Sequence, residues 1–189
     1  MEKPKSYCEF VENLEKSNVH RAYHDTKYGF PITSDSELFE RLVLEINQAG
    51  LSWTTILNKQ ENFRKAYSEF NVRKLARFNE ENIEKLLSDP GIIRNKLKIN
   101  ATIFNAQKIV DIQGEYGSFK SWLDYNNPLQ LDDWVELFKK TFKFTGREIT
   151  KEFLTSTGYL KGAHEKDCPI FNKIIQEGPM WDKSSDPQA

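Results

Sequence analysis

Long hydrophobic runs are absent from this 189-residue sequence. A membrane-spanning helix needs about 18 or more consecutive apolar residues, and no stretch of the chain approaches that length. The opening residues, MEKPKSYCEF, are polar and lack the apolar segment of a secretory signal peptide. We therefore expect neither a membrane protein nor an exported one, and predict a cytoplasmic location.

Cysteine is scarce as well. The chain has two, Cys8 and Cys168, which is too few for the disulfide scaffold of a small secreted domain. In a reducing compartment, free cysteines serve as core residues or as metal ligands. The low count therefore agrees with a cytoplasmic location and leaves a metal site open.

An excess of charge of one sign is also missing, since 27 Lys and Arg residues face 28 Asp and Glu residues. A DNA-binding surface would then require local segregation of charge. The segment from Gly91 to Val110 holds four basic residues and no acidic one, and the segment from Lys59 to Arg77 holds six basic and two acidic residues. Each segment fits either a DNA contact or an ordinary solvated helix face.

The alternation typical of β-strands does not occur, and apolar residues recur at helical spacing instead, which predicts an all-α domain. Helix N-caps are predicted at Ser34, Ser52, Asn71, Asn79 and Ser118. The expected helices cover about residues 35–49, 53–67, 92–112, 118–123, 132–142 and 147–157, with two short helices between 71 and 88. The sequence from Gln176 onward is rich in Ser, Pro and Asp and is predicted to be a disordered tail.

Glu45 lies at the border of the apolar stripe on the predicted helix 35–49. A carboxylate at the edge of a buried face costs free energy unless it is paired or used. One interpretation is an edge salt bridge, for which Arg41 is the nearest basic neighbour on the helix. The other is a hydrogen-bond acceptor or base in a partly apolar pocket.

A tight turn is predicted directly after this helix, because Gly50 ends it and Ser52 begins the next one. That arrangement can place Glu45 and Trp53 on two walls of one crevice. A carboxylate beside an aromatic ring suits a flat ligand that forms hydrogen bonds. Simple core packing is the alternative interpretation of Trp53.

A metal site is predicted from the few Cys and His residues. His164 and Cys168 are separated by three residues, a spacing that brings two ligand atoms onto one helix face or around one tight turn. Cys8, with either His20 or His24, could complete a tetrahedral Cys₂His₂ zinc site by joining the two ends of the chain. The composition does not choose between His20 and His24, and isolated Cys and His residues are usually not ligands.

The Asp89-Pro90-Gly91 sequence predicts a turn between two helices. It resembles a helix-hairpin-helix motif, in which backbone N–H groups of a tight turn face a DNA phosphate and a basic run follows. The usual second glycine of that motif is Ile93 here. An ordinary turn between antiparallel helices fits the sequence equally well.

Several short motifs follow one another in a distinctive order. They are Ala22-Tyr23-His24-Asp25, Tyr28-Gly29, Leu44-Glu45, Gln48 to Trp53, Gly91 to Asn95 with Lys98, Phe142 to Gly146, and His164 with Cys168. Together these motifs resemble the bacterial 3-methyladenine DNA glycosylase type I family. The similarity covers roughly Cys8 to Cys168, nearly the whole domain.

This resemblance implies a helix-hairpin-helix glycosylase fold in a single domain over residues 1–175. The domain would comprise a zinc-stapled lobe of about residues 1–33 and 145–175 and a helical core of about residues 34–144. The implied ligands of a structural zinc ion are Cys8, His24, His164 and Cys168.

The resemblance also implies the function and the residues that carry it. The expected activity is hydrolysis of the N-glycosidic bond of 3-methyladenine, flipped out of double-stranded DNA, by a monomeric enzyme without strand cleavage. Glu45 would be the catalytic and base-reading residue, with Tyr23, Trp53 and Tyr28 around the base. The residues expected to contact DNA are Gly50, Leu51, Gly91 and Arg94.

The chain departs from the family pattern at several places. Tyr28 stands where the family commonly has Trp, and Arg147 stands where a small residue or proline is expected. The segment between Cys8 and His24 is longer than usual, so that His20 could replace a pocket aromatic, and residues 120–140 match poorly. These departures affect substrate preference more than the zinc ligands or Glu45.

Other functions fit parts of the sequence. A zinc-stapled protein that binds alkylated DNA without cutting it would explain the basic segments but would not need Glu45. A small-molecule hydrolase using the Glu45–Trp53 crevice would show no salt-sensitive DNA affinity. Asp111, about 20 residues beyond the turn, matches the spacing of a catalytic aspartate in related glycosylases, but we expect a surface role for it.

Overall fold

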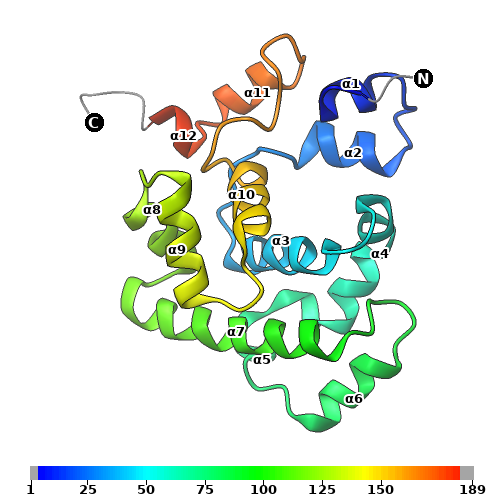
Figure 1. Ribbon diagram of the computed structural model, residues 1–189, viewed down its shortest axis with the longest axis vertical. Coiled ribbons are helices and arrows are strands. Elements are labelled where there is room, and N and C mark those ends of the chain that lie inside the picture. The colour runs from blue at the N-terminus through cyan, green and yellow to red at the C-terminus, as the bar shows by residue number, and fades with distance from the viewer. Residues whose placement is uncertain (1–3, 184–189) are drawn as a thin grey trace. The chain divides into compact units, whose positions relative to one another are not determined.

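The computed structural model describes residues 4–183, and every regular element within them is helical (Figure 1). The expectation of an all-α protein is therefore confirmed for this part of the chain. None of the helices in it is both long and apolar enough to cross a membrane. The elements are α1 (Tyr7–Glu12), α2 (Val19–Thr26), α3 (Asp35–Gln48), α4 (Trp53–Ala66), the 3₁₀ helix η1 (Ser68–Phe70), α5 (Val72–Leu75), α6 (Glu80–Ser88), α7 (Lys96–Tyr116), α8 (Phe119–Asn126), α9 (Leu131–Thr141), α10 (Arg147–Ser156), α11 (Phe171–Gln176) and α12 (Met180–Lys183).

The chain forms two compact units. Unit 1 combines Met1–Ile32 with Glu152–Ala189, and unit 2 is the continuous segment Thr33–Lys151. Unit 1 is thus built from two segments that are far apart in sequence, whereas unit 2 contains α3 to α9. The boundary between the units falls within α10. The description of residues 1–175 as one functional domain stays a prediction.

Helix α3 is the central element of unit 2. It packs against α4, α7 and α8, and its residues from Leu38 to Asn47 are all buried. Such burial requires partners for its polar side chains. Glu40 accepts hydrogen bonds from Arg64 at 2.9 Å and from Gln60 at 2.5 Å, both on α4. Burial around α3 therefore extends beyond the apolar stripe that the sequence predicts.

Side-chain caps begin most helices where the sequence predicts them. Ser34 accepts a hydrogen bond from the backbone N–H of Glu37, and Ser52 accepts one from that of Thr55. The same kind of cap is made by Asn71, Asn79 and Ser118. Each cap satisfies one backbone donor that the first turn of a helix leaves without a partner.

The long helix α7 begins later than the sequence predicts, at Lys96 rather than near Ile92, and ends at Tyr116 rather than near Ile112. The Asn95 side chain accepts hydrogen bonds from the N–H groups of Leu97 and Lys98 and so sets the start. Gly117, at φ 83°, sets the end. The predicted start was too early because the apolar residues Ile92 and Ile93 continue the helical pattern, although they lie in the turn before α7.

Three other boundaries also differ from the prediction. Helix α8 continues to Asn126, beyond Leu123, and α9 begins at Leu131 without a side-chain cap. The tail predicted to be disordered from Gln176 onward contains the helix α12, so that prediction is wrong for residues 180–183. The rest of the predicted tail, residues 184–189, lies outside the described part of the chain.

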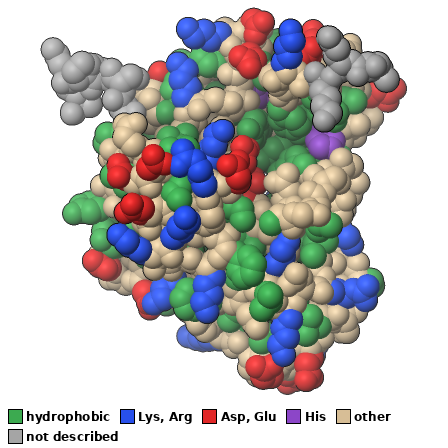
Figure 2. Space-filling model, in the orientation of Figure 1, with side chains coloured by type: hydrophobic (Ala, Val, Ile, Leu, Met, Phe, Trp, Pro, Cys, Tyr) green, Lys and Arg blue, Asp and Glu red, His purple; other side chains and the backbone are tan. Residues whose placement is uncertain are grey.

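Charge is mixed on the face shown in Figure 2, where Lys and Arg side chains alternate with acidic ones. Acidic side chains gather at the lower edge, over α6, which carries Glu80, Glu81 and Glu84. Basic and acidic residues are nearly equal in number over the whole sequence, and α6 is a place where acidic residues collect.

Candidate functional site

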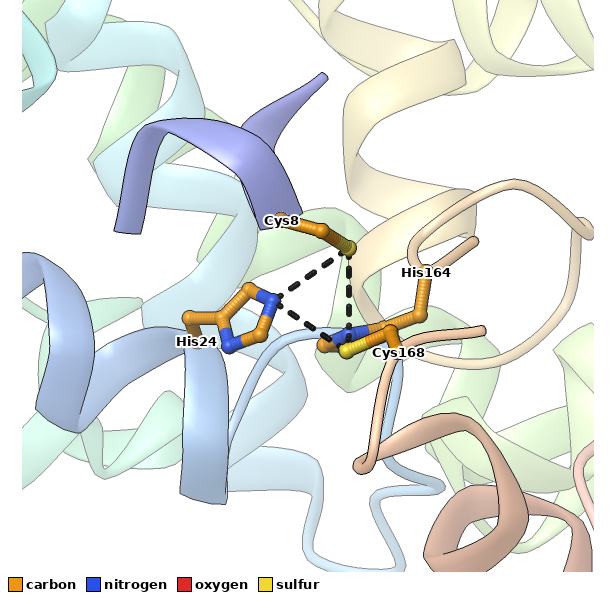
Figure 3. Close-up of side chains that lie close together, drawn as sticks. All are labelled: Cys8, His24, His164 and Cys168. Atoms are coloured by element: carbon orange, nitrogen blue, oxygen red, sulfur yellow. Dashed lines mark hydrogen bonds between the residues drawn. The ribbon is translucent and has the colours of Figure 1, made fainter. Parts of the chain in front are cut away.

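The four residues expected to bind zinc lie together in unit 1 (Figure 3). Cys8 comes from α1, His24 from the last turn of α2, and His164 and Cys168 from the segment between α10 and α11. One ligand atom from each residue lies within 4.8 Å of the other three. The predicted grouping of these four side chains is therefore confirmed.

The distances among the ligand atoms match a tetrahedral site. The His24 Nε2 atom lies 3.4 Å from the Cys8 sulfur and 3.8 Å from the Cys168 sulfur. The His164 Nδ1 atom lies 3.4 Å from the Cys168 sulfur and 3.8 Å from the Cys8 sulfur. Tetrahedral zinc with ordinary Zn–S and Zn–N bonds requires nitrogen-to-sulfur distances of about 3.6 Å. The side chains present thus fit a zinc ion without rearrangement.

The second nitrogen of each imidazole is held by a hydrogen-bond acceptor. His24 Nδ1 lies 2.7 Å from the Asp25 carboxylate, and His164 Nε2 lies 2.8 Å from the Tyr28 carbonyl oxygen. Such contacts fix the ring orientation and the tautomer that presents a lone pair to a metal. His20 is not part of the group, because its Nδ1 atom lies 3.0 Å from the Tyr7 hydroxyl.

Burial also shifts the pKa of two members of this group, His164 and Cys8. It lowers the pKa of His164 to about 4, so that the imidazole is neutral and able to coordinate at neutral pH. It raises the pKa of Cys8 to about 11, so that a metal ion must displace the proton of that thiol on binding.

Aromatic rings form a second group in unit 1. Tyr23 is 4% exposed, and its ring centroid lies 5.7 Å from that of Tyr28. Tyr7 stacks edge-on against Tyr28 at 5.4 Å, and Phe10 lies edge-on to His20 at 5.1 Å. The Tyr28 hydroxyl also donates to Glu152 at 3.3 Å. Two of the residues predicted to surround a base, Tyr23 and Tyr28, are therefore neighbours.

Glu45 and Trp53 belong to unit 2. Glu45 is only 5% exposed although it is a carboxylate, and it lies one turn before the end of α3. Trp53 is the first residue of α4 and is half-buried. Between them the chain turns sharply: the Leu51 N–H donates to the Gln48 carbonyl at 2.7 Å, and Gly50 has a φ of 83°. Leu51 remains 40% exposed at this turn.

Gly91 and Arg94 lie in the turn between α6 and α7. The Gly91 N–H donates to the Asp89 carboxylate at 2.7 Å. A Cβ atom on Gly91 would lie 2.9 Å from that carboxylate oxygen and 3.1 Å from the Asn62 Cβ atom, so a larger residue there would force these two side chains to shift. Arg94 is exposed.

The methyladenine glycosylase family model matches residues 13–131 of the sequence. The chain belongs to this family. It is 35% identical over 174 residues to DNA-3-methyladenine glycosylase 1 of Escherichia coli strain K12, an alignment that covers 82% of the chain and 92% of the relative. It is 30% identical over 173 residues to DNA-3-methyladenine glycosylase of Haemophilus influenzae, covering 82% and 93%.

Solved structures of methyladenine glycosylases share the fold. A variant of 3-methyladenine DNA glycosylase I in complex with 3-methyladenine has a TM-score of 0.75 at 32% identity, with 82% of this chain and 94% of that one covered. The enzyme from Staphylococcus aureus has a TM-score of 0.74 at 32% identity, with 82% and 93% covered. The expected family and the enzyme class, a glycosylase, are confirmed.

Family membership leaves the roles of single residues to be argued from their surroundings. Tyr7 and Phe10, which lie near Cys8 on α1 and join the aromatic group of this glycosylase, were not predicted from the sequence. Their nearness in sequence to Cys8, a predicted metal ligand, was the feature that could have pointed to them. Asp111 lies on α7 with an exposed side chain, paired with Lys108 at 3.1 Å, as expected for a surface residue.

Proposed function

We propose that this protein removes 3-methyladenine from alkylated double-stranded DNA by hydrolysing the bond between the base and deoxyribose. It would act as a cytoplasmic monomer and leave the DNA strand intact. The observation that carries the proposal is the similarity, at a TM-score of 0.75, to a glycosylase in complex with 3-methyladenine. The buried carboxylate of Glu45 supplies the chemistry that this substrate needs.

The lesion itself lowers the chemical demand on the enzyme. 3-Methyladenine in DNA carries a formal positive charge and departs as a neutral base, so a strong general acid is unnecessary. The protein must extrude the nucleotide, hold a cationic ring, and stabilise a sugar with oxocarbenium character. All three requirements are met by positioned side chains.

Glu45 is the residue we assign to base recognition. A carboxylate accepts hydrogen bonds from the amino group of adenine, which selects adenine over bases that present a carbonyl at that edge. Its negative charge also favours a cationic ring and the developing charge on the sugar. Because Glu45 is 5% exposed, its field is screened less by water than that of a surface carboxylate.

Aromatic side chains supply the rest of the base-binding surface in this proposal. Tyr23, Tyr28 and Trp53 present faces that attract a cationic ring, an interaction of about 0.5–2 kcal/mol each. A tyrosine at position 28 offers a smaller face than the tryptophan common in the family. Exact substrate preference among alkylated purines follows from these contacts.

Two parts of the protein are assigned to structure and DNA contact. A structural zinc ion would be held by Cys8, His24, His164 and Cys168. When bound, it would link α1 and α2 to the segment before α11. The α6–α7 segment would act as a helix-hairpin-helix, with Gly91 and Arg94 at a phosphate. Gly50 and Leu51 would fill the gap left by the extruded nucleotide, for which the exposure of Leu51 is suited.

The proposal is tested by chromatography of the bases released from methylated double-stranded DNA. We expect free 3-methyladenine to be released while the strand remains uncut until alkali is added. A protein that binds the methylated DNA but releases no base would contradict the proposal and identify a recognition module. Absence of both release and salt-sensitive DNA binding would point to a small-molecule substrate.

A further inference from the structure

Two lysines in unit 2 bind backbone carbonyl groups across two turns. We infer that Lys59 and Lys98 are positioning residues that together form a lysine brace, which holds the α3–α4 turn (residues 49–52) against the α6–α7 turn (residues 89–95). The Lys98 ammonium donates to the Asn47 carbonyl at 2.9 Å and to the Ala49 carbonyl at 2.8 Å. Lys98 thus binds the C-terminal end of α3 from the first turn of α7.

Lys59 makes the reciprocal contact. From α4, its ammonium donates to the Pro90 carbonyl at 2.8 Å and to the Gly91 carbonyl at 3.1 Å. Each lysine therefore lies on the helix that follows one turn and binds carbonyl groups at the other turn. Figure 1 shows α4 beside the loop that joins α6 to α7, which is the segment that Lys59 bridges.

The surroundings of both lysines fit a positioning role. The acceptors of Lys98, Asn47 and Ala49, lie at the C-terminal end of α3, where the last carbonyl groups lack partners within the helix and carry partial negative charge, so an ammonium group satisfies them well. The acceptors of Lys59 lie in the turn that follows α6. Lys98 is 7% exposed, and a buried ammonium persists only when its donors are used. Gly91 has no side chain, which allows the α6–α7 turn to lie directly against Asn62 of α4.

The consequence concerns DNA binding and rests on the proposed function. Gly50 and Leu51 lie in one turn, and Gly91 and Arg94 lie in the other. If both turns contact the same DNA duplex, their spacing must be fixed before binding, because ordering them at that moment would reduce affinity. The two lysines supply this fixed spacing without contacting the base.

The first test needs no DNA. Amide hydrogen exchange is measured on Lys98→Met and Lys59→Met, with Lys108→Met on α7 and Lys65→Met on α4 as matched losses of a lysine outside the brace. We expect about tenfold faster exchange at residues 49–52 in Lys98→Met and at residues 89–95 in Lys59→Met. Unchanged protection of both turns would overturn the inference. Lys98→Arg and Lys59→Arg, which keep the charge and the donors, should restore part of the protection even if a Met variant folds poorly.

The second test uses base release from methylated DNA. We expect KM to rise by about tenfold in each Met variant relative to its control, while kcat changes less. A loss of folded protein would instead lower kcat and leave KM unmoved. The salt dependence of DNA affinity should match that of the controls. A slope reduced by about 0.9 with turn protection unchanged would mean a direct phosphate contact and would overturn the brace.

The two proposals fail in different ways. Wild-type protein that releases no base contradicts the proposed function, and hydrogen exchange still decides whether the lysines hold the turns. Active wild-type protein whose Lys98→Met and Lys59→Met variants behave as their controls contradicts the brace alone.

Discussion

At the scale of single residues, the three histidines differ in their surroundings. His20, His24 and His164 are all buried, yet only the last two present a nitrogen to the cysteine sulfurs. The sequence alone left His20 and His24 as equal candidates, and family resemblance favoured His24. The physical basis is the pairing of His24 with Asp25 and of His20 with Tyr7.

Replacing His164 should therefore abolish metal binding, whereas replacing His20 should not. We expect purified His164→Ala to contain almost no zinc and to unfold at a temperature about 10 °C lower, because the ion's binding energy contributes to folding. His20→Ala should retain one zinc ion per chain. Elemental analysis and thermal unfolding measure both effects. Equal zinc contents in the two variants would contradict the assigned ligand set.

The unusual position of Glu45 could be recognised in the sequence, because a carboxylate at the border of an apolar stripe is uncommon. The lysine brace could not be predicted in this way. Lys98 and Ala49 are 49 residues apart, and Lys59 and Pro90 are 31 residues apart. No local sequence pattern predicts a lysine that binds a distant backbone carbonyl group, because every residue carries such a group whatever its side chain is.

At the scale of helices, capping residues made the boundaries predictable. Five predicted caps, Ser34, Ser52, Asn71, Asn79 and Ser118, accept the expected backbone hydrogen bonds. The start of α7 was missed because Ile92 and Ile93 continue the apolar pattern into the turn, while Asn95 is the actual cap. At the start of α7, the cap made by Asn95 sets the helix boundary, although the apolar periodicity continues before it.

Asp35 links α3 to both α7 and α8 in a way that helical periodicity does not reveal. Its carboxylate accepts hydrogen bonds from the backbone N–H groups of Phe119 and Lys120, at 2.8 and 3.0 Å, and from the Gln113 side chain at 2.7 Å. It therefore supplies negative charge to the first turn of α8 from the first turn of α3.

Asp35→Ala should destabilise the protein by about 2–3 kcal/mol, because it leaves two backbone donors and one amide donor without their acceptor. The thermal midpoint should fall by about 5–10 °C. Asp133→Ala, at an exposed position in the first turn of α9, serves as the control and should change the midpoint much less. Similar midpoints for the two variants would show that the Asp35 contacts do not contribute to stability.

At the scale of the whole molecule, unit 1 differs from unit 2 in how it is held together. Its two segments come from opposite ends of the sequence, and the Cys₂His₂ group takes two of its four side chains from each segment. Unit 2 is continuous and is organised around the buried helix α3. The all-α class was predictable from the helical periodicity of the apolar residues. The few Cys and His residues predicted a four-residue group drawn from the two ends of the sequence, and the family resemblance selected His24 for it.

Metal removal should therefore loosen unit 1 selectively. We expect chelation of zinc to accelerate amide exchange in α1, α2 and residues 164–176, while α3 and α7 keep their protection. Hydrogen exchange with mass spectrometry on holo and chelated protein makes this comparison. Uniform acceleration across both units would show instead that the metal supports the entire fold equally.

In the proposed function, the buried carboxylate of Glu45 reads and stabilises the lesion. The most direct measurement is the rate of 3-methyladenine release from methylated DNA by Glu45→Gln and by Glu37→Gln, an exposed glutamate on the same helix. We predict a loss of about a hundredfold or more for Glu45→Gln, with unchanged zinc content and thermal midpoint, and a wild-type rate for Glu37→Gln. A wild-type rate for folded, zinc-loaded Glu45→Gln would contradict this role of Glu45.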